Sequence, residues 1–372
     1  MIPIKKHEMH TQDNKAHDRH DREFQQQFVK NLVPLKSVDL SQCHSVNDVI
    51  KQMNFASFGA REVGEAADIL EIMTKDKDCF KVLTLSGAMT MAKMGLVICE
   101  MIENGMVDAV VSTGALMAHG FIEAAGMTHF KNPGTMLDED LYQVGFDRVY
   151  DTLESEANLD EGAEILIKVL EKFDRSKTVC SSVINRELGR YLHQNVQGRG
   201  ILKSAFEKNV PVYIPAFTDS EFGLEFAVFN RKNAVEGKEL LRYDPFIDMN
   251  DYTERVLHAK KMGIFTIGGG VPRNWAQQVG PHLDIIRMRV IEQDEKLKKD
   301  AHLYKKQFSY GVRICPEPVT LGGLSGCTYS EGVSWGKFIP TSQGGKFAEV
   351  YADATIVLPF LIKGVLERLG KT

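Results

Sequence analysis

Short apolar runs alternate with helix-like segments along most of this chain. The runs KVLTLSG at 81–87 and VDAVVSTGA at 107–115 each end in small residues, and a stretch with helical spacing follows each of them. Later apolar runs continue the pattern at 209–219, 261–271, 309–315 and 351–360. Nearly continuous apolar strands fit a sheet that is covered on both faces. Repeated strand–helix units therefore predict an α/β fold with a mostly parallel sheet and helices on both sides.

Composition narrows the class of protein. The 372 residues are 43% hydrophobic and 26% charged, which suits a globular chain with a sizeable core. The net charge of −5 argues against nucleic-acid binding, which needs a basic face. The six cysteines are scattered and form no CxxC pair, so we expect them to be reduced and mostly buried. A polar N-terminus and the lack of an apolar run of about 20 residues predict a cytoplasmic protein without a membrane partner.

The first 35 residues differ from the rest of the chain. They form a polar arm, residues 1–35, that contains His7, His10, His17 and His20. An HxxH pair could bind a metal ion, but no cysteine or apolar shell lies nearby, so we expect a solvated extension and no metal site. Residues 36–372 show no repeat or linker and are predicted to form one large domain.

Small and polar residues stand at the ends of the predicted strands, which is where ligands bind in parallel sheets. The usual dinucleotide fingerprint GxGxxG is absent. The triplet Gly268–Gly270 could present backbone amides to a phosphate or a nicotinamide ring, or could only make a tight turn. Asp219 could bind ribose hydroxyls or cap a helix. From these residues alone, each position has two interpretations: part of a nucleotide site, or a residue that only shapes a turn or caps a helix.

The segment SEGVSWGKF at 330–338 contains a lysine in an unusual setting. Lys337 follows a glycine and an aromatic residue, and no basic residue precedes it closely. Partly apolar surroundings can lower the pKa of a lysine, and the neutral amine can form a Schiff base. Trp335 could hold an alkylammonium group by cation–π attraction, or it could pack in the core. Glu331 could pair with an ammonium group or move a proton, or it could be solvated.

The motifs EGVSWGK at 331–337 and VYADATIVLP at 350–359 resemble the C-terminal signature of deoxyhypusine synthases, which have EAVSWGK and then YADAS. The order and spacing of LTLSGAMT (83–90), VDAVVSTGA, VPVYIPAFTD (210–219) and IGGGV (267–271) resemble the same family over about 290 residues. The resemblance implies a Rossmann-like domain that assembles as a homotetramer with active sites at dimer interfaces. It also implies that NAD is the cofactor. Spermidine would be oxidised, and an aminobutyl group would pass through an imine on lysine to an acceptor amine.

The resemblance also implies a role for individual residues. Lys337 matches the imine-forming lysine, with Glu331 beside it as the second catalytic residue. The positions that match the cofactor site are Gly87, Ala88, Met89, Thr113, Gly114, Ala115, His119, Asp219, Gly269, Asp353 and Ala354. The positions expected to line the substrate channel are Trp335, Asn274, Gly323, Leu324, Ser325 and Glu225.

The departures from the family concern the substrate more than the cofactor. Asn274 stands where members that modify a protein carry a histidine, and an amide cannot titrate near neutral pH. The loop LGGLSG at 321–326 lacks two carboxylates, and Leu224 replaces another, for which the adjacent Glu225 could compensate. His119 replaces a glutamate near the cofactor. This pattern is similar to the deoxyhypusine synthase-like branch that is common in bacteria, some of whose relatives make homospermidine with a small diamine such as putrescine as acceptor.

Two other functions stay open at this point. The chain could be a non-catalytic protein that binds NAD or a polyamine on the same fold, because a histidine and several acids are missing. It could also be a simple amine dehydrogenase, which would accumulate NADH without transferring an alkyl group.

Overall fold

Six parallel strands form the central sheet. The computed structural model describes residues 26, 28–30 and 32–371, so most of the predicted arm and its four histidines lie outside the described residues. The strand order is β11-β10-β9-β1-β2-β7, and every neighbouring pair is parallel. The strands are β1 (Cys79–Leu85), β2 (Ala109–Ser112), β7 (Val212–Tyr213), β9 (Lys261–Ile267), β10 (Tyr310–Ile314) and β11 (Lys346–Val350).

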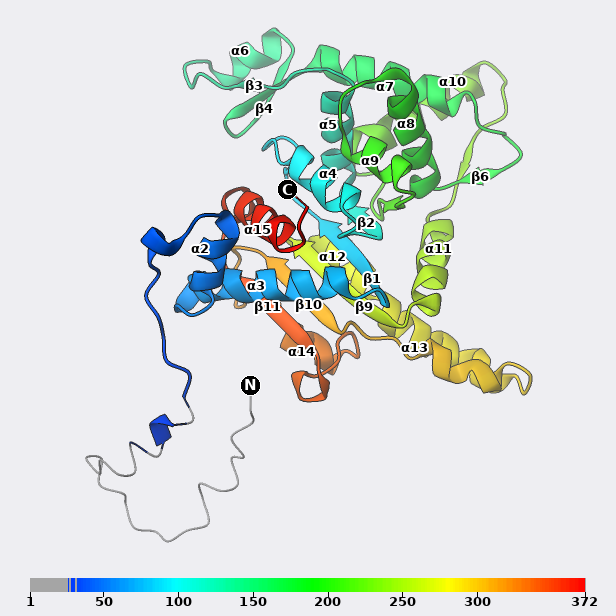
Figure 1. The fold of residues 1–372 in the computed structure, drawn as a ribbon. Helices are drawn as coiled ribbons and strands as arrows, with labels where there is room; N and C mark the ends of the chain where they lie inside the picture. Colours follow the sequence, from blue (N-terminus) through cyan, green and yellow to red (C-terminus); the bar gives the residue numbers. More distant parts are fainter. Residues whose placement is uncertain (1–25, 27, 31, 372) are drawn as a thin grey trace.

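Helices cover both faces of this sheet (Figure 1). The α-helices of the described residues are α2 (Val46–Met53), α3 (Phe58–Lys75), α4 (Gly95–Glu103), α5 (Gly114–Ala124), α6 (Asp138–Gln143), α7 (Glu156–Leu170), α8 (Ser181–Asn195), α9 (Ile201–Glu207), α10 (Glu221–Val235), α11 (Pro245–His258), α12 (Gly270–Gln277), α13 (Val279–Arg289), α14 (Tyr329–Ser334) and α15 (Ala354–Arg368). The predicted α/β class, with a mostly parallel sheet between two helical layers, is confirmed.

The two faces of the sheet carry separate cores because successive side chains of a strand point in opposite directions. In β1, Leu83 belongs to the cluster that α3 and α15 cover, whereas Val82 belongs to the cluster under α12 and α13. In β9, Phe265 likewise belongs to the first cluster and Ile264 to the second. The apolar strands therefore contain no polar face, as the sequence predicted.

Two smaller sheets lie outside the central one. The strands β3 (Phe130–Lys131), β5 (Thr152–Ser155) and β4 (Phe146–Val149) form an antiparallel sheet. Along the chain, these strands lie between α5 and α7. The strands β6 (Thr178–Val179) and β8 (Arg242–Tyr243) form a parallel pair. The first of these sheets places His129 and Glu154 next to α5.

Several element boundaries differ from the prediction. The run at 351–360 was predicted as a strand but begins α15, and the strand is the preceding Lys346–Val350. Asp353 caps this helix by accepting from the Thr355 amide at 2.9 Å. The helix reads as a continuous apolar run because its exposed face is also apolar: Ile356 is 66% and Phe360 61% exposed. The helix that follows the run at 81–87 is α4, which begins at Gly95, and the helix at the end of the run at 261–271 is α12, which begins at Gly270.

The cysteine prediction is confirmed for the described residues: all six thiols are free, and four of them are buried. Within the described part of the chain, no helix is both long enough and apolar enough to cross a membrane.

Candidate active site

Lys337 follows α14 and is held in place from both sides. Gly336 adopts a φ of 69°, a left-handed conformation that favours glycine, and turns the chain out of the helix. The next residue, Phe338, is fully buried, and the Phe308 amide donates to the Lys337 carbonyl at 2.9 Å. The Lys337 ammonium nitrogen Nζ donates to Asn274 Oδ1 at 3.1 Å. The backbone is thus anchored in the core while the amine meets α12.

The surroundings favour the neutral form of this amine. Partial burial lowers the pKa of Lys337, and the nearby Arg273 guanidinium lowers it further. Cys327 and Glu331 act in the opposite direction but do not reverse the shift. A lowered pKa is the condition under which a lysine becomes a nucleophile near neutral pH. The prediction that Lys337 sits in pKa-lowering surroundings is therefore consistent with its contacts.

Two buried arginines and a glutamate, here called the arginine clamp (Arg273, Arg313 and Glu349), fix the start of α14. The guanidinium of Arg273, only 5% exposed, donates to the carbonyls of Ser325 at 3.0 Å and Cys327 at 2.5 Å. Arg313 is 1% exposed, donates to the Cys327 carbonyl and pairs with Glu349 at 3.0 Å.

The same glutamate also contacts the helix itself, because Glu349 Oε1 accepts from the Tyr329 amide at 2.6 Å. The sequence patterns did not predict the clamp. Its one signal was Arg313, a charged residue inside the apolar run at 309–315.

The other residues of the signature lie around Lys337 at the surface. The Trp335 side chain is 67% exposed, so the core-packing alternative is wrong for it. Lys337 Nζ lies 6.0 Å from the centre of the Trp335 ring. Trp335 and Gly336 line a cavity of about 390 Å³, together with Asp284 and Ile285 of α13. Glu331 is exposed on the first turn of α14, where its amide donates to Thr328 Oγ1.

The predicted cofactor residues gather at the carboxyl edge of the sheet. Gly87 follows β1, Thr113 follows β2 and Gly269 follows β9, and these three strands are neighbours. Ser86 Oγ links two of these loops by accepting from the Gly269 amide at 2.9 Å. Gly269 also abuts Ser325, since a Cβ atom there would lie 2.6 Å from the serine Cβ. The loop at 315–328 therefore contacts the glycine turn.

Two residues predicted at the cofactor site lie at opposite ends of the carboxyl edge of the central sheet. Asp219 precedes α10 beside β7 and is exposed, whereas Asp353 follows β11. With strands about 4.8 Å apart, the two lie on the order of 24 Å from each other. Asp353 has a structural role as the cap of α15, and Ala354 is buried in the first turn of that helix.

The remaining predicted substrate residues divide between two places. Gly323, Leu324 and Ser325 lie in the loop before α14, and Leu324 is 61% exposed with a φ of 59°. Glu225 lies on α10, which Figure 1 places at the opposite end of the protomer from α14. Within one chain the structure therefore does not bring Glu225 to Lys337.

The carboxyl edge has the features that a bound dinucleotide requires. Thr113 Oγ1 and Glu221 Oε2 are buried and have no hydrogen-bond partner among the described residues. Buried polar atoms without partners are costly unless a ligand satisfies them. Gly87 and Gly270 have positive φ angles of 76° and 62°, with open space where a Cβ would point. These residues fit a nucleotide that approaches the backbone closely.

His119 belongs to a buried cluster behind this edge. Its Nδ1 lies 3.2 Å from Glu154 Oε2, and His129 Nε2 contacts the same oxygen. The ligand atoms of these three side chains lie within 4.8 Å of one another, a spacing at which they could hold a metal ion. Sequence reasoning named His119 alone, because His129 and Glu154 come from the small antiparallel sheet and follow no motif.

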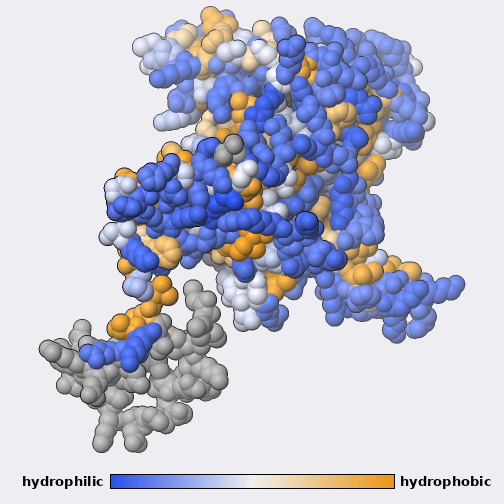
Figure 2. All heavy atoms as spheres, viewed as in Figure 1, coloured by the Kyte–Doolittle hydropathy of each residue, from blue (hydrophilic) through white to orange (hydrophobic). Residues whose placement is uncertain are grey.

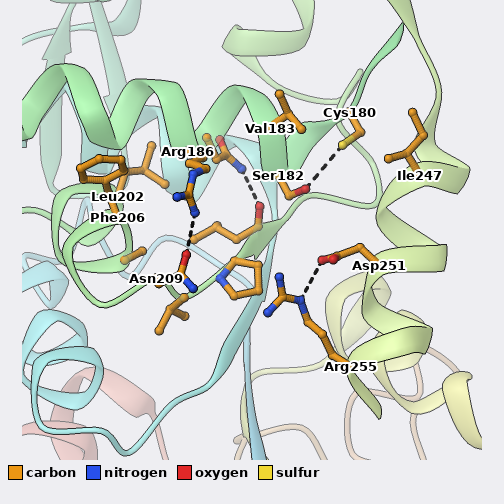
Figure 3. Close-up of a pocket in the computed structure, with 15 residues that line it drawn as sticks. Cys180, Ser182, Val183, Arg186, Leu202, Phe206, Asn209, Ile247, Asp251 and Arg255 are labelled. Carbon is orange, nitrogen blue, oxygen red and sulfur yellow. Dashed lines mark hydrogen bonds and ion pairs between the residues drawn. The ribbon is translucent and has the colours of Figure 1, made fainter. Parts of the chain in front are cut away.

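A separate cavity of about 250 Å³ lies between α8, α9 and α11 (Figure 3). Its charged side chains are paired: Arg255 with Asp251 at 2.9 Å, and Arg186 with Asn209 at 2.7 Å. None of the predicted site residues lines this cavity.

Comparison with known proteins identifies the family. A sequence model of the family described as deoxyhypusine synthase matches residues 48–365. The chain belongs to the deoxyhypusine synthase family. It is 32% identical to an assigned deoxyhypusine synthase 1 of Methanosarcina acetivorans over 91% of this chain and 96% of that protein. It is 31% identical to the deoxyhypusine synthase-like protein of Chlorobaculum parvum over 90% of this chain and 89% of that protein.

The fold agrees with this membership. A crystal structure from Entamoeba histolytica, assigned as a deoxyhypusine synthase, superposes with a TM-score of 0.56 at 17% identity. It covers 89% of this chain and 96% of that one. The resemblance inferred from EGVSWGK and YADA is thus confirmed at the level of the family, and family membership supports an aminobutyl transferase.

Proposed function

We propose that this chain is an NAD-dependent aminobutyl transferase that uses Lys337 as its imine-forming nucleophile. The single observation that carries the proposal is the state of that amine. It is partly buried, held by Asn274 at 3.1 Å, and its pKa is lowered by burial and by Arg273. NAD, when bound at the carboxyl edge, would accept a hydride from the polyamine and return it at the end.

The residues of the chain supply the transfer itself. The neutral Lys337 nitrogen attacks the imine carbon of the oxidised polyamine, and the departing diamine carries away the other nitrogen. Asn274 Oδ1 accepts from the Lys337 nitrogen and so orients its lone pair. Asn274 cannot exchange protons near neutral pH. Glu331 is the residue that we propose for that task.

Trp335 is suited to bind the charged ammonium end of the substrate. Its exposed ring, 6.0 Å from Lys337 Nζ, can attract an alkylammonium group. Spermidine or a related polyamine is the proposed donor. The acceptor is a second amine, either a protein lysine or a diamine such as putrescine, which would give homospermidine. Asn274 and the uncharged loop at 321–326 favour the small diamine, because both differ from members that modify a protein.

We propose that the active unit is a homotetramer of cytoplasmic chains with sites at dimer interfaces. Hydrophobic side chains reach the surface around Lys337: Trp335 is 67%, Val271 53% and Ile285 42% exposed. Figure 2 shows hydrophobic side chains at the surface around α13, which bears Ile285. A neighbouring chain would also provide a way for an acid such as Glu225 to approach a lysine that it does not reach within its own chain.

The test is to trap the intermediate. The purified protein is incubated with NAD, spermidine and putrescine, then reduced with borohydride and digested for mass spectrometry. We expect an aminobutyl adduct on Lys337, release of 1,3-diaminopropane, and loss of both in Lys337→Ala. Lys305→Ala is the matched control, since it removes an exposed lysine that lines the same cavity as Trp335.

The outcomes separate the alternatives. Net NADH without an adduct would indicate an amine dehydrogenase, and binding of NAD without any turnover would indicate a non-catalytic protein. Either result would refute the proposal. Product analysis with each acceptor then distinguishes a protein lysine from putrescine.

A further inference from the structure

The cavity between α8, α9 and α11 lies at the edge of the central sheet that is opposite to the candidate active site. The segment 209–212, which lines this cavity, leads into the start of β7. The predicted cofactor residues Gly87 and Thr113 follow the ends of their strands. Because the strands are parallel, all starts meet at one edge and all ends meet at the other. We call this space the amino-edge cavity.

Two arginines point into the amino-edge cavity from different helices, Arg186 from α8 and Arg255 from α11 (Figure 3). Arg255 Nε donates to Asp251 at 2.9 Å, and Arg186 Nη1 donates to Asn209 Oδ1 at 2.7 Å. The Arg186 guanidinium carbon also lies 5.7 Å from the centre of the Phe206 ring. A guanidinium group carries five N–H donors, so each arginine retains donors for a ligand.

The charges that line the cavity do not balance. Asp251 is the one carboxylate among the described lining residues, and it accepts from Arg255 and from the Tyr213 hydroxyl. The partner of Arg186 is the side chain of Asn209, an amide that supplies an acceptor but no charge. An arginine stays protonated at any physiological pH. The lining therefore has a net charge of about +1, which attracts one negative charge and repels a polyamine.

The rest of the cavity wall is largely apolar. Its apolar side chains are Val183, Leu202, Ala205, Phe206, Pro211 and Ile247. Pockets for small molecules combine such walls with a few polar groups that orient the ligand. The volume of about 250 Å³ lies just below the usual range of about 300–1,000 Å³, so the ligand must be small.

The polar groups of the cavity favour binding over catalysis. Burial, together with the charge of Asp248, raises the pKa of the Cys180 thiol to about 12, and a neutral thiol is a poor nucleophile. Ser182 Oγ lies 3.4 Å from that thiol, which cannot act as its base. The described lining residues include no histidine and no glutamate.

We propose that the amino-edge cavity binds a small carboxylate with a single negative charge and an apolar or aromatic body. The carboxylate is held mainly by Arg186, whose charge is uncompensated, and Arg255 adds further donors. The two oxygens of a carboxylate match the parallel N–H groups of a guanidinium. The apolar body packs against Phe206 and Leu202. This site goes beyond the aminobutyl transfer, because its ligand is neither a polyamine nor a dinucleotide.

The test uses ligand-observed NMR on the full chain with three probes of the same shape and different charge. Benzoate should bind with a Kd of about 1 mM or tighter, in the absence of NAD and polyamine. Benzamide, which is neutral, should bind at least about tenfold more weakly, because it makes no charge-assisted hydrogen bond. Benzylamine, which is protonated at neutral pH, should not bind.

Two variants and a matched control locate the site. Arg186→Gln should weaken benzoate binding about tenfold or more. Arg190→Gln is the control: it removes a cation from the same helix at the same 5.7 Å from the Phe206 ring, but Arg190 pairs with Glu187 and does not line the cavity. Val183→Phe should abolish binding by filling the cavity, and Val183 is 37% exposed, so the larger ring can be accommodated without unfolding.

Each contrary outcome overturns the assignment. Equal affinity for benzoate and benzamide, or an equal loss in Arg186→Gln and Arg190→Gln, would show that Arg186 does not recognise the charge. A folded Val183→Phe protein that binds like the wild type would place benzoate elsewhere. Displacement by NAD would place benzoate at the cofactor site, and displacement by an equal concentration of inorganic phosphate would indicate a general anion site. None of these results affects the trapping experiment on Lys337, so the two proposals fail independently.

Discussion

Removing the charge of Glu349 should loosen the segment that carries the proposed nucleophile. Glu349 is the sole carboxylate paired with Arg313 among the described residues, and Arg313 is 1% exposed. In Glu349→Gln the guanidinium stays buried with only the carbonyls of Ser325 and Cys327 as acceptors. The Tyr329 amide would also exchange a charged acceptor for a neutral one.

The expected loss follows from these contacts. Breaking a buried ion pair costs about 3–5 kcal/mol, and the 20% exposure of the Glu349 side chain favours the lower end of that range. A chain of 372 residues has an unfolding entropy of about 0.8 kcal/mol/K. A loss of about 3 kcal/mol therefore corresponds to a decrease in Tm of about 4 °C, measurable by calorimetry.

The control and a double variant make this prediction refutable. Glu164→Gln removes an exposed partner of Lys168 and should cost less than about 0.5 kcal/mol. Replacing both Arg313 and Glu349 by Met should recover most of the stability lost in the single variant, because no uncompensated charge is left. A single variant no less stable than the Glu164 control, or a double variant less stable than Glu349→Gln, would refute the interpretation of the clamp.

Three further predictions concern Lys337, Glu154 and Trp335. Because the pKa of Lys337 is lowered, the folded state binds fewer protons than the unfolded state and stability rises with pH. Lys337→Met should therefore stabilise the protein at pH 7 in urea titrations, and the gain should shrink as pH approaches 10.5. Glu154, with a pKa of about 2 against 4.5 unfolded, contributes stability that is present above pH 4.5 and lost as pH falls toward 2. In acid titrations Glu154→Gln should cost about 3 kcal/mol at pH 7 and nearly nothing at pH 2. Trp335→Leu should weaken polyamine binding by about 2- to 5-fold in calorimetry, since a cation–π contact at an exposed ring contributes about 0.5–1 kcal/mol, whereas Trp335→Phe should lose less.

The sequence predicted the parts of the fold that depend on local pattern. Alternating apolar runs correctly indicated β1, β9 and β10, because a strand buried on both faces reads as continuous apolar sequence. The same reasoning failed at 351–360, since a helix whose exposed face is also apolar, here at Ile356 and Phe360, produces a run of the same kind. Asp353, a good helix cap before that run, was the available signal.

The candidate site was predictable only where a motif carried it. Lys337 and Trp335 came from EGVSWGK, whereas the residues that shape their surroundings are distant in sequence and match no spacing rule. Glu349 and Arg313 meet because β10 and β11 are paired in register. Glu154 and His129 meet because β3 and β5 pair in the small antiparallel sheet. Such contacts depend on tertiary packing, which periodicity does not report.

The two buried polar clusters have one property in common that stability alone does not explain. A buried charge network is weak evidence for stability, because apolar residues of similar volume often stabilise as well or better. Yet each cluster lies beside a proposed site: Arg273 of the arginine clamp is close to Lys337, and His119 of the buried cluster with His129 and Glu154 is a predicted cofactor residue. The clamp also affects a property that packing does not set, the proton affinity of the Lys337 amine. If that is why the charges are buried, replacing the clamp by apolar residues should keep the protein folded while raising the pKa of Lys337, since Arg273 is one of the causes that lower it.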